Sequence, residues 1–285
     1  MNPTLVRAAV LILCSELLFT IGNAAIKTVS ASQPLEMIVF FRNIFGLGLL
    51  VPMILRNGVS SLRTKVPHMH LMRGLVGVSG MYCFFYAFSH LPLAEATTFK
   101  LTSPLFIPII AFLWLKERIP KLAIAAVIIG FAGVLLILRP GTGAMSTASL
   151  IGLLGALFAA DAFVTVRRMT ATEPGTRIVF YFTVIALLVS AVPLLWAWKT
   201  PTLAELAWMC VVGGCATGAQ LLFTRAYALA PAGQIGPLTY VSVVYGALFG
   251  WLFWDELLGV LTVTGITLVV LAGILTIYAK PEAAK

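Results

Sequence analysis

Two stretches of this chain, residues 87–117 and 226–256, align without a gap when 139 is added to each residue number of the first. Both start at the end of a predicted helix, pass through a proline-containing turn, and continue as an apolar run that closes on a glutamate. The identical pairs are Ala87/Ala226, Pro92/Pro231, Ser103/Ser242, Leu113/Leu252 and Glu117/Glu256. A repeat of this length predicts that the chain is built from two copies of one structural unit.

Apolar residues are too frequent in this chain for a soluble domain. Hydrophobic residues make up 60% of the 285 residues and charged residues 10%, whereas soluble domains contain roughly 25% charged residues. A helix needs about 20 mostly apolar residues to cross a bilayer. The apolar runs therefore predict an all-α integral membrane protein with ten transmembrane helices, in two five-helix repeats over residues 1–140 and 141–285. The predicted spans are Leu5–Ile26, Leu35–Leu55, Met69–His90, Ala94–Leu115, Lys121–Leu138, Ala148–Val166, Thr176–Trp196, Leu203–Leu229, Gln234–Trp254 and Leu257–Tyr278.

Lys and Arg gather in alternate connections between these spans, which accounts for the net charge of +9 without a nucleic-acid partner. The segments on the side of the N-terminus contain Arg7, Arg56, Arg63, Lys65, Arg73, Lys116, Arg118, Lys121, Arg167, Arg168, Arg177, Lys280 and Lys285. The opposite segments contain Lys27, Arg139 and Lys199. Because cytoplasmic connections carry the excess of basic residues, both termini are predicted to be cytoplasmic. Five helices per repeat is an odd number, so the second repeat is predicted to be inverted in the membrane.

Charged residues within the spans are costly in a bilayer and usually functional. Those predicted to bind substrate are Glu16, Arg42, Lys100 and Asp161. Glu16 is the clearest case because no cation lies near it on its own helix, and it is predicted to bind an amine or a proton. The structural alternative is mutual neutralisation, of Glu95 by Arg42 or Lys100, and of Asp161 by Arg168.

Uncharged residues on neighbouring spans complete the predicted substrate site. Tyr82 and Tyr86 are four residues apart and so share one helix face, and Gln220 occupies the repeat position of Met81. Asn23 and Tyr240 are included as well. A tyrosine hydroxyl at membrane depth needs a polar partner, which a wet cavity provides, although aromatic stripes also serve plain packing.

Prolines interrupt corresponding helices of the two predicted repeats. Pro104 and Pro108 follow Lys100, and Pro237 precedes Tyr240. Each proline removes a backbone hydrogen bond, so kinks are predicted at these positions. Interruptions in corresponding helices of two repeats are typical of transporter binding sites.

Enzyme readings have little support in the sequence. Residues 77–80 (Gly-Val-Ser-Gly) fit a short pattern of intramembrane serine proteases, but His68, His70 and His90 all lie at predicted helix ends, where none is a suitable base for Ser79. No phosphate-binding loop or metal-ligand cluster is present, so no ATP, metal or other cofactor is predicted. The four cysteines all fall within apolar runs and are expected to be small buried hydrophobic residues.

The repeated region resembles the EamA-type branch of the drug/metabolite transporter superfamily. The resemblance rests on Leu229–Ala232, Pro237–Tyr240 and Gly250–Glu256, and on their counterparts Leu93–Ala96, Pro104-Leu105 and Trp114–Arg118, together with Arg42. It implies ten helices in two inverted repeats and a cavity lined by helices 1, 3, 4, 6, 8 and 9. The family carries amino acids and their derivatives, nucleobases, vitamins and cations, and this chain most resembles bacterial amino-acid exporters whose substrates include aromatic ones. Ile21-Gly22 replaces a frequent Trp-Gly, and the family pattern does not require Glu16 or Lys100.

The resulting hypothesis is a multi-pass secondary transporter of the bacterial inner membrane, monomer or weak dimer, that exports amino acids or similar small zwitterions. Glu16 would bind the ammonium group, Lys100 or Arg42 the carboxylate, and Tyr82, Tyr86 and Tyr240 the side chain. One alternative is an importer of a larger metabolite such as riboflavin or S-adenosylmethionine. The others are a non-transporting membrane scaffold and, last, an intramembrane enzyme.

Overall fold

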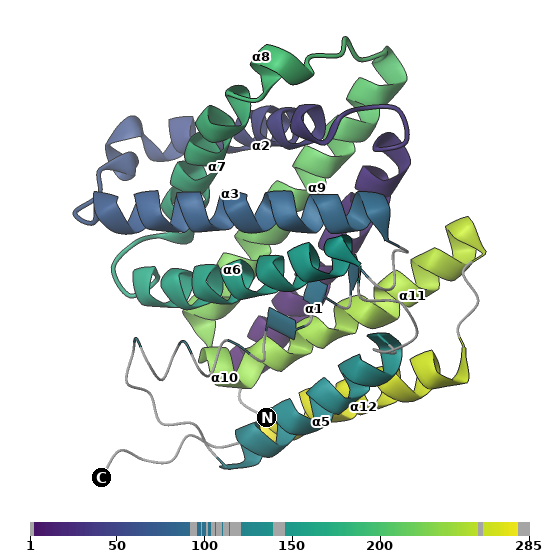
Figure 1. Ribbon diagram of the computed structural model, residues 1–285. Helices are drawn as coiled ribbons and strands as arrows, with labels where there is room; N and C mark the ends of the chain where they lie inside the picture. Colours follow the sequence, from purple (N-terminus) through teal and green to yellow (C-terminus); the bar gives the residue numbers. More distant parts are fainter. Residues whose placement is uncertain are drawn as a thin grey trace.

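The computed structural model describes residues 3–91, 96–97, 99–100, 102–103, 106, 110, 114, 121–138, 146–255 and 259–278, and every regular element among them is helical (Figure 1). The α-helices are α1 (Pro3–Val29), α2 (Leu35–Asn57), α3 (Pro67–His90), α5 (Lys121–Leu138), α6 (Thr147–Met169), α7 (Gly175–Ala191), α8 (Leu194–Ala197), α9 (Leu203–Leu229), α10 (Ala232–Ile235), α11 (Val241–Trp254) and α12 (Val260–Tyr278). Short 3₁₀ segments cover Val59–Leu62 and Gly236–Tyr240. Most of the predicted helix 94–115 lies outside the described residues, with Pro92, Glu95, Pro104, Pro108, Glu117 and Glu256.

The helix ends follow the spacing of the sequence repeat. Helices α3 and α9 end at His90 and Leu229, and helices α5 and α12 begin at Lys121 and Val260, each pair 139 residues apart. The same spacing relates α1 to α6 and α2 to α7 within one to five residues at each start. The two halves of the chain therefore break into helices at equivalent positions.

Packing partners also exchange between the halves. Helix α1 packs on α9 as α3 packs on α6, and α2 packs on α9 as α3 packs on α7, while α2 meets α7 and α5 lies beside α12 (Figure 1). A Cβ added to Gly213 would lie 3.2 Å from the backbone nitrogen of Gly46, and one added to Gly74 would lie 2.8 Å from the Cβ of Ile185. These two close approaches join residues that correspond under the 139-residue spacing. The inversion of the halves across a membrane stays a prediction.

Two predicted spans are interrupted by proline. The span predicted over Thr176–Trp196 divides at Pro193 into α7 and α8. Proline has no backbone N–H with which to continue the hydrogen bonds of α7. The span predicted over Gln234–Trp254 begins with α10 and a 3₁₀ segment that contains Pro237, and only then continues as α11. The predicted break at Pro237 is confirmed.

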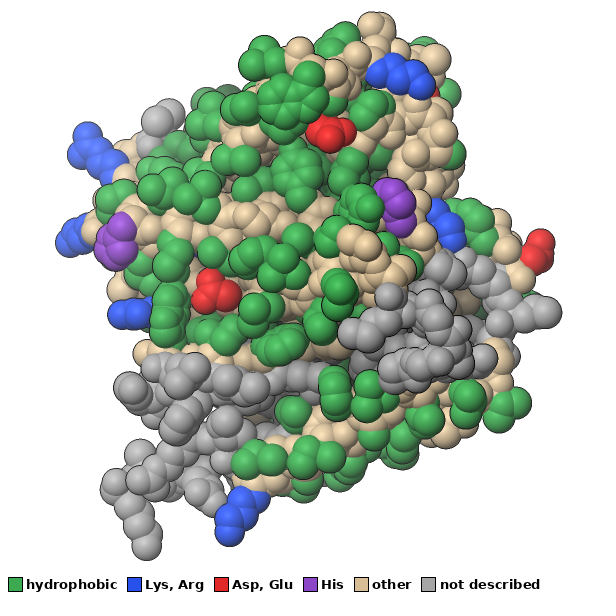
Figure 2. Space-filling view, in the orientation of Figure 1, with side chains coloured by type: hydrophobic (Ala, Val, Ile, Leu, Met, Phe, Trp, Pro, Cys, Tyr) green, Lys and Arg blue, Asp and Glu red, His purple; other side chains and the backbone are tan. Residues whose placement is uncertain are grey.

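Hydrophobic side chains cover much of the described part of the face that Figure 2 shows. Five of the described helices, α1, α2, α3, α6 and α9, are long and apolar enough to cross a bilayer. Large apolar side chains such as Leu188 and Leu55 are more than 60% exposed, and an extended apolar surface of this kind suits contact with lipid. Cys14 and Cys210 are exposed on this surface, so the expectation that all four cysteines are buried is wrong.

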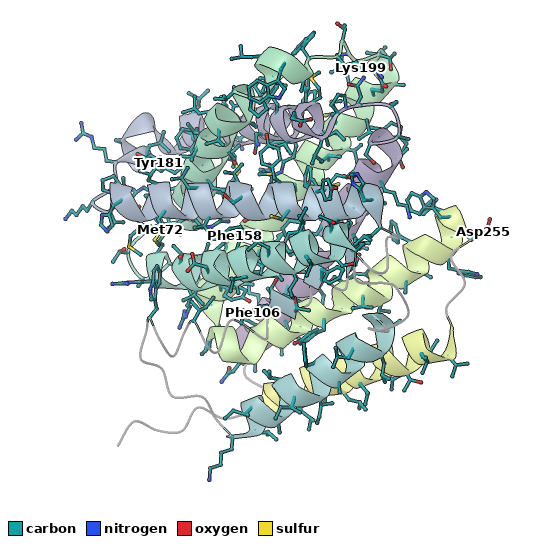
Figure 3. All side chains as sticks on the ribbon, viewed as in Figure 1. Met72, Phe106, Phe158, Tyr181, Lys199 and Asp255 are labelled. Carbon is teal, nitrogen blue, oxygen red and sulfur yellow. The ribbon has the colours of Figure 1, made fainter. Side chains whose placement is uncertain are left out.

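A polar cluster joins the two halves at one end of the bundle. Glu173, between α6 and α7, accepts hydrogen bonds from Arg177 Nη1 at 2.8 Å and Thr64 Oγ1 at 3.0 Å, and lies 3.4 Å from His70 Nε2. Burial alone would raise the pKa of Glu173, but these hydrogen bonds and the charge of Arg177 outweigh it and lower the pKa. Tyr181 packs against His70 beside the cluster, toward the left of Figure 3.

A second contact between the halves lies elsewhere on the bundle, beside Lys199 at the upper right of Figure 3. Lys199 donates to the carbonyl oxygen of Ser32, and the Ser32 hydroxyl donates to Glu205 at 2.5 Å. Glu205 and Thr202 together form a capping box at the start of α9. The connection after α1 therefore contacts α9, the repeat counterpart of α3. In the same way, the connection after α6 contacts α3.

Candidate substrate cavity

Helices of both halves surround a cavity of about 130 Å³, enough space for on the order of ten water molecules or one small metabolite. Its lining residues from the first half are Phe19, Gly22, Asn23, Ile26, Arg42, Arg73, Gly77, Gly80, Met81, Phe84, Phe85, Phe88 and Lys100. Those from the second half are Ala159, Ala162, Phe163, Phe182, Val212, Ala216 and Gln220. Among described residues, α2 and α7 therefore contribute to the lining and α11 does not, which corrects the set of helices that the family resemblance implied.

The charges of the cavity belong to one half of the chain. Arg42, Arg73 and Lys100 line it from the first half, and Gln220 is the polar side chain among the lining residues of the second half. The repeat counterparts of the three basic residues are Tyr181, Val212 and Thr239. The first half therefore supplies all the basic side chains of the lining, whereas the second half supplies alanine, valine, phenylalanine and the neutral amide of Gln220.

Lys100 is held at the cavity by a buried ion pair. Its Nζ lies 2.7 Å from Oε2 of Glu16, and the side chains are 14% and 1% exposed. The same ammonium lies 4.4 Å from the centroid of the Phe19 ring, where it makes a cation–π contact. The sequence contains no cation near Glu16 on its own helix. In the structure, Lys100 of the predicted fourth helix is the cation that pairs with it.

The other two basic side chains meet on one aromatic ring. The guanidinium carbon of Arg73 lies 4.2 Å from the centroid of Phe182, and that of Arg42 lies 5.4 Å from it. Arg42 donates to the amide oxygen of Asn43 at 2.7 Å, and Arg73 donates to the amide oxygen of Gln220 at 3.5 Å. Both arginines are at most 5% exposed, and their hydrogen-bond acceptors are neutral.

A glycine makes room for the Arg73 guanidinium. A Cβ added to Gly77 would collide with Nη1 of Arg73 and would lie 2.8 Å from the ring of Phe182. Three residues further along α3, a Cβ on Gly80 would lie 3.1 Å from Phe158, which projects between α3 and α6 in Figure 3. Packing and space for the arginine thus account for both glycines of the Gly-Val-Ser-Gly pattern.

The structure gathers some of the predicted site residues and separates others. Asn23, Arg42, Lys100 and Gln220 line the cavity, and Glu16 contacts it through Lys100. The four remaining predicted residues, Tyr82, Tyr86, Asp161 and Tyr240, are not among its lining residues.

Each tyrosine has other surroundings because the helix faces point elsewhere. The Tyr86 ring stacks on His90 with centroids 4.0 Å apart, and the buried Tyr240 packs against Gly130 of α5. The hydroxyl of Tyr82 is buried without a hydrogen-bond partner. Phenylalanines therefore occupy the aromatic positions of the cavity that were expected to be tyrosine.

Of the lining residues that were not predicted from the sequence as part of the site, Arg73 and Phe182 bear most directly on its charge. Arg73 was counted among the basic residues of a cytoplasmic connection, but it lies within α3 and is 4% exposed. Its place inside an apolar run, four residues before Gly77, was the available signal. Phe182 gave no signal, because one phenylalanine in an apolar helix resembles any other. When Arg73 is left out of the charge count, the segments on the predicted cytoplasmic side still contain more Lys and Arg residues than the opposite segments.

Comparison with known proteins supplies a family and several relatives. The model of the EamA-like transporter family matches residues 6–139 and again residues 146–278. The pseudopaline exporter of Pseudomonas aeruginosa is 37% identical over 257 residues, which cover 89% of this chain and 90% of the exporter. The S-adenosylmethionine uptake transporter of Rickettsia bellii is 27% identical over 86% of this chain and 84% of its own length. The riboflavin transporter of Brucella anthropi is 27% identical over 77% and 79%.

A solved crystal structure shares the fold across nearly the whole chain. It aligns with a TM-score of 0.77 and 20% sequence identity, and the alignment covers 95% of this chain and 97% of the other. At this identity the similarity concerns the arrangement of helices alone.

Proposed function

Because the chain belongs to the EamA-like transporter family, whose members here are small-molecule transporters and not enzymes, we propose that it exports amino acids, including aromatic ones, or similar small zwitterionic metabolites. Export would take place across the bacterial inner membrane, with both termini in the cytoplasm, and would proceed by alternating access of the cavity. The pseudopaline exporter, at 37% identity, supports the direction of transport.

The ion pair between Glu16 and Lys100 is the observation that carries the proposal. Removing either partner of a buried pair leaves the other charge uncompensated at a cost of about 3–5 kcal/mol. A zwitterion compensates both charges at once, because its ammonium group binds Glu16 while its carboxylate binds Lys100. A ligand with a single charge satisfies one of them and leaves the other unpaired. The pair therefore selects a head group that carries both charges.

The apolar part of the cavity accommodates the remainder of such a ligand. Phe84, Phe85, Phe88, Phe163 and Phe182 all contribute to the lining. Aromatic pairs gain about 0.5–1.5 kcal/mol beyond the burial of their area, which favours aromatic side chains in the ligand. The phenylalanines take the role that the sequence had assigned to Tyr82, Tyr86 and Tyr240.

Efflux from proteoliposomes tests the proposal directly. Purified protein is reconstituted, loaded with a panel of labelled amino acids and small zwitterions, and efflux is compared with empty liposomes. We expect efflux for at least one aromatic amino acid, and its loss in Lys100→Met. Arg225→Gln is the control, because Arg225 is exposed on α9 and outside the cavity. Efflux equal to that of empty liposomes across the whole panel would rule out the proposed substrates.

Uptake of a larger aromatic metabolite is the second candidate. Relatives with 27% identity are named as S-adenosylmethionine and riboflavin transporters, and a phenylalanine-lined wall suits a flat ring system. Competition distinguishes the two candidates: an excess of riboflavin or S-adenosylmethionine that abolishes amino-acid efflux, together with their uptake into the liposomes, would favour this second function.

A further inference from the structure

The cavity contains more positive charge than a zwitterionic head group needs. Lys100 is compensated by Glu16 at 2.7 Å, but Arg42 and Arg73 have no carboxylate partner at ion-pair distance among the described residues. Asp161 on α6 attracts Arg73 electrostatically without a direct ion pair. Two guanidinium groups therefore lie buried on helices that are long and apolar enough to cross a bilayer, with neutral hydrogen-bond partners.

The two groups converge on a single place in the cavity. Both guanidinium carbons lie within 5.4 Å of the centroid of Phe182, so the ring holds them on a shared aromatic surface. Nε and Nη1 of Arg73 are buried and make no hydrogen bond. The single described hydrogen bond from Arg42 to an acceptor goes to the amide of Asn43. Donors are thus unused where both positive charges are concentrated.

An arginine side chain presents its N–H groups as a planar fork that matches the two oxygens of a carboxylate. A buried charge without a partner is unfavourable, and charged residues at membrane depth commonly mark the substrate path. Among the described residues no carboxylate lies within ion-pair distance of either guanidinium group, and both arginines are lining residues of the cavity.

From this geometry we propose that the carried metabolite has at least one further carboxylate beyond its zwitterionic head group, and that Arg42 and Arg73 bind it beside Phe182. The inference rests on the proposed function and narrows it to amino acids that carry a second carboxylate. Glu16 and Lys100 bind the ammonium and the first carboxylate, and the two arginines determine the preference for the second.

Paired ligands test the inference on the purified, full-length protein. Calorimetric titration compares glutamate and 2-aminoadipate, each against the analogue in which the distal carboxylate is an amide. We expect at least one acid to bind tenfold or more tightly than its amide. If no acid binds more tightly than its amide, the inference is wrong.

Substitution of each arginine tests whether Arg42 and Arg73 cause the preference for the acid over its amide. In Arg42→Gln and Arg73→Gln we expect the acid-to-amide ratio to fall below threefold, while binding of the amides stays within threefold of the wild type. Arg225→Gln should keep the full preference. A preference that persists in both arginine variants would place the second carboxylate elsewhere and overturn the assignment, and the wild-type comparison remains decisive if a variant does not fold.

The two proposals fail in different ways. Loss of efflux with the acid preference intact would contradict export while leaving the ligand class standing. Efflux of monocarboxylic amino acids with no preference for any acid would leave the proposed function standing and contradict the polycarboxylate class. O-Phosphoserine is the remaining arm, and tighter binding of this phosphate than of every carboxylate would replace the carboxylate by a phosphate as the bound group.

Discussion

The ammonium nitrogen of Lys100 lies 2.7 Å from a carboxylate oxygen of Glu16, although 84 residues separate them in the chain. Neither residue has a charged partner on its own helix in the described structure, so each is the compensation for the other. This pair connects the first helix to the predicted fourth helix and places an exchangeable pair of charges beside the cavity.

Disrupting this pair should affect stability and transport differently. Glu16→Gln and Lys100→Met should each destabilise the protein by about 3–5 kcal/mol, because one buried charge loses its partner. The double variant should recover much of that stability, since no charge is left unpaired, yet it should remain inactive in efflux. Thermal unfolding in detergent measures the first effect. Additive losses in the double variant would mean that the two side chains do not compensate one another.

Gly77→Ala should impair ligand binding while leaving the fold intact. The added methyl group would displace the Arg73 guanidinium from Phe182, and flexible side-chain ends can move without unfolding the protein. We expect the affinity for the preferred dicarboxylic amino acid to fall at least tenfold in calorimetric titration. Gly48→Ala is the matched control, because no atom lies within 4 Å of its added Cβ, and it should bind as the wild type does. Equal affinities in the two variants would contradict the role of Gly77.

The same substitution at two adjacent glycines of α9 should destabilise the protein at one position and leave its stability nearly unchanged at the other. A Cβ on Gly213 would lie 2.7 Å from the backbone oxygen of Arg42, whereas a Cβ on Gly214 would be 3.7 Å from the end of Leu49. Gly213→Ala must separate α2 from α9, so a loss of about 1–3 kcal/mol is expected. Gly214→Ala should change the thermal midpoint by less than about 1 °C, a shift that corresponds to about 0.6 kcal/mol. Similar midpoints for the two variants would show that α2 and α9 are not in close contact here.

The cluster around Glu173 should make stability depend on acid pH. The pKa of this carboxyl group is lower in the folded protein than its ordinary value of 4.5, so the folded state favours the ionised form. The stabilisation is complete above the unfolded pKa and is lost as the pH falls through the folded pKa. Glu173→Gln should therefore be less stable than the wild type at pH 7, and the difference should shrink below about pH 4. A difference in thermal midpoint that is constant from pH 7 to pH 3.5 would contradict this assignment.

The repeat and the helix positions could be predicted because they depend on local properties of the chain. The predicted span Lys121–Leu138 coincides with α5, and Pro237 interrupts its helix as expected. Among the site residues, the charges at Glu16, Arg42 and Lys100 were identified because a charge within an apolar run is conspicuous.

The partners of those residues could not be predicted, because these helices are apolar on nearly all sides. Tyr82 and Tyr86 share a helix face with one another, but the spacing does not say which neighbour that face meets. In the fold, Tyr86 stacks on His90 at the end of α3, while Phe182 of α7 reaches the cavity. Arg73 lies early in α3, so its position in the sequence suggested a connection. Tertiary packing alone made it part of the cavity.

The one-sided charge of the cavity has a consequence for the resting state of the carrier. If two inverted halves were identical, a cavity open to one side would be the same structure as a cavity open to the other, and the two states would have equal free energy. Arg42, Arg73 and Lys100 all belong to the first half, and this removes the equivalence. The empty protein should rest in the state that hydrates the guanidinium groups better. An anionic ligand replaces that hydration, so loading brings the two states closer in free energy and lowers the cost of crossing between them.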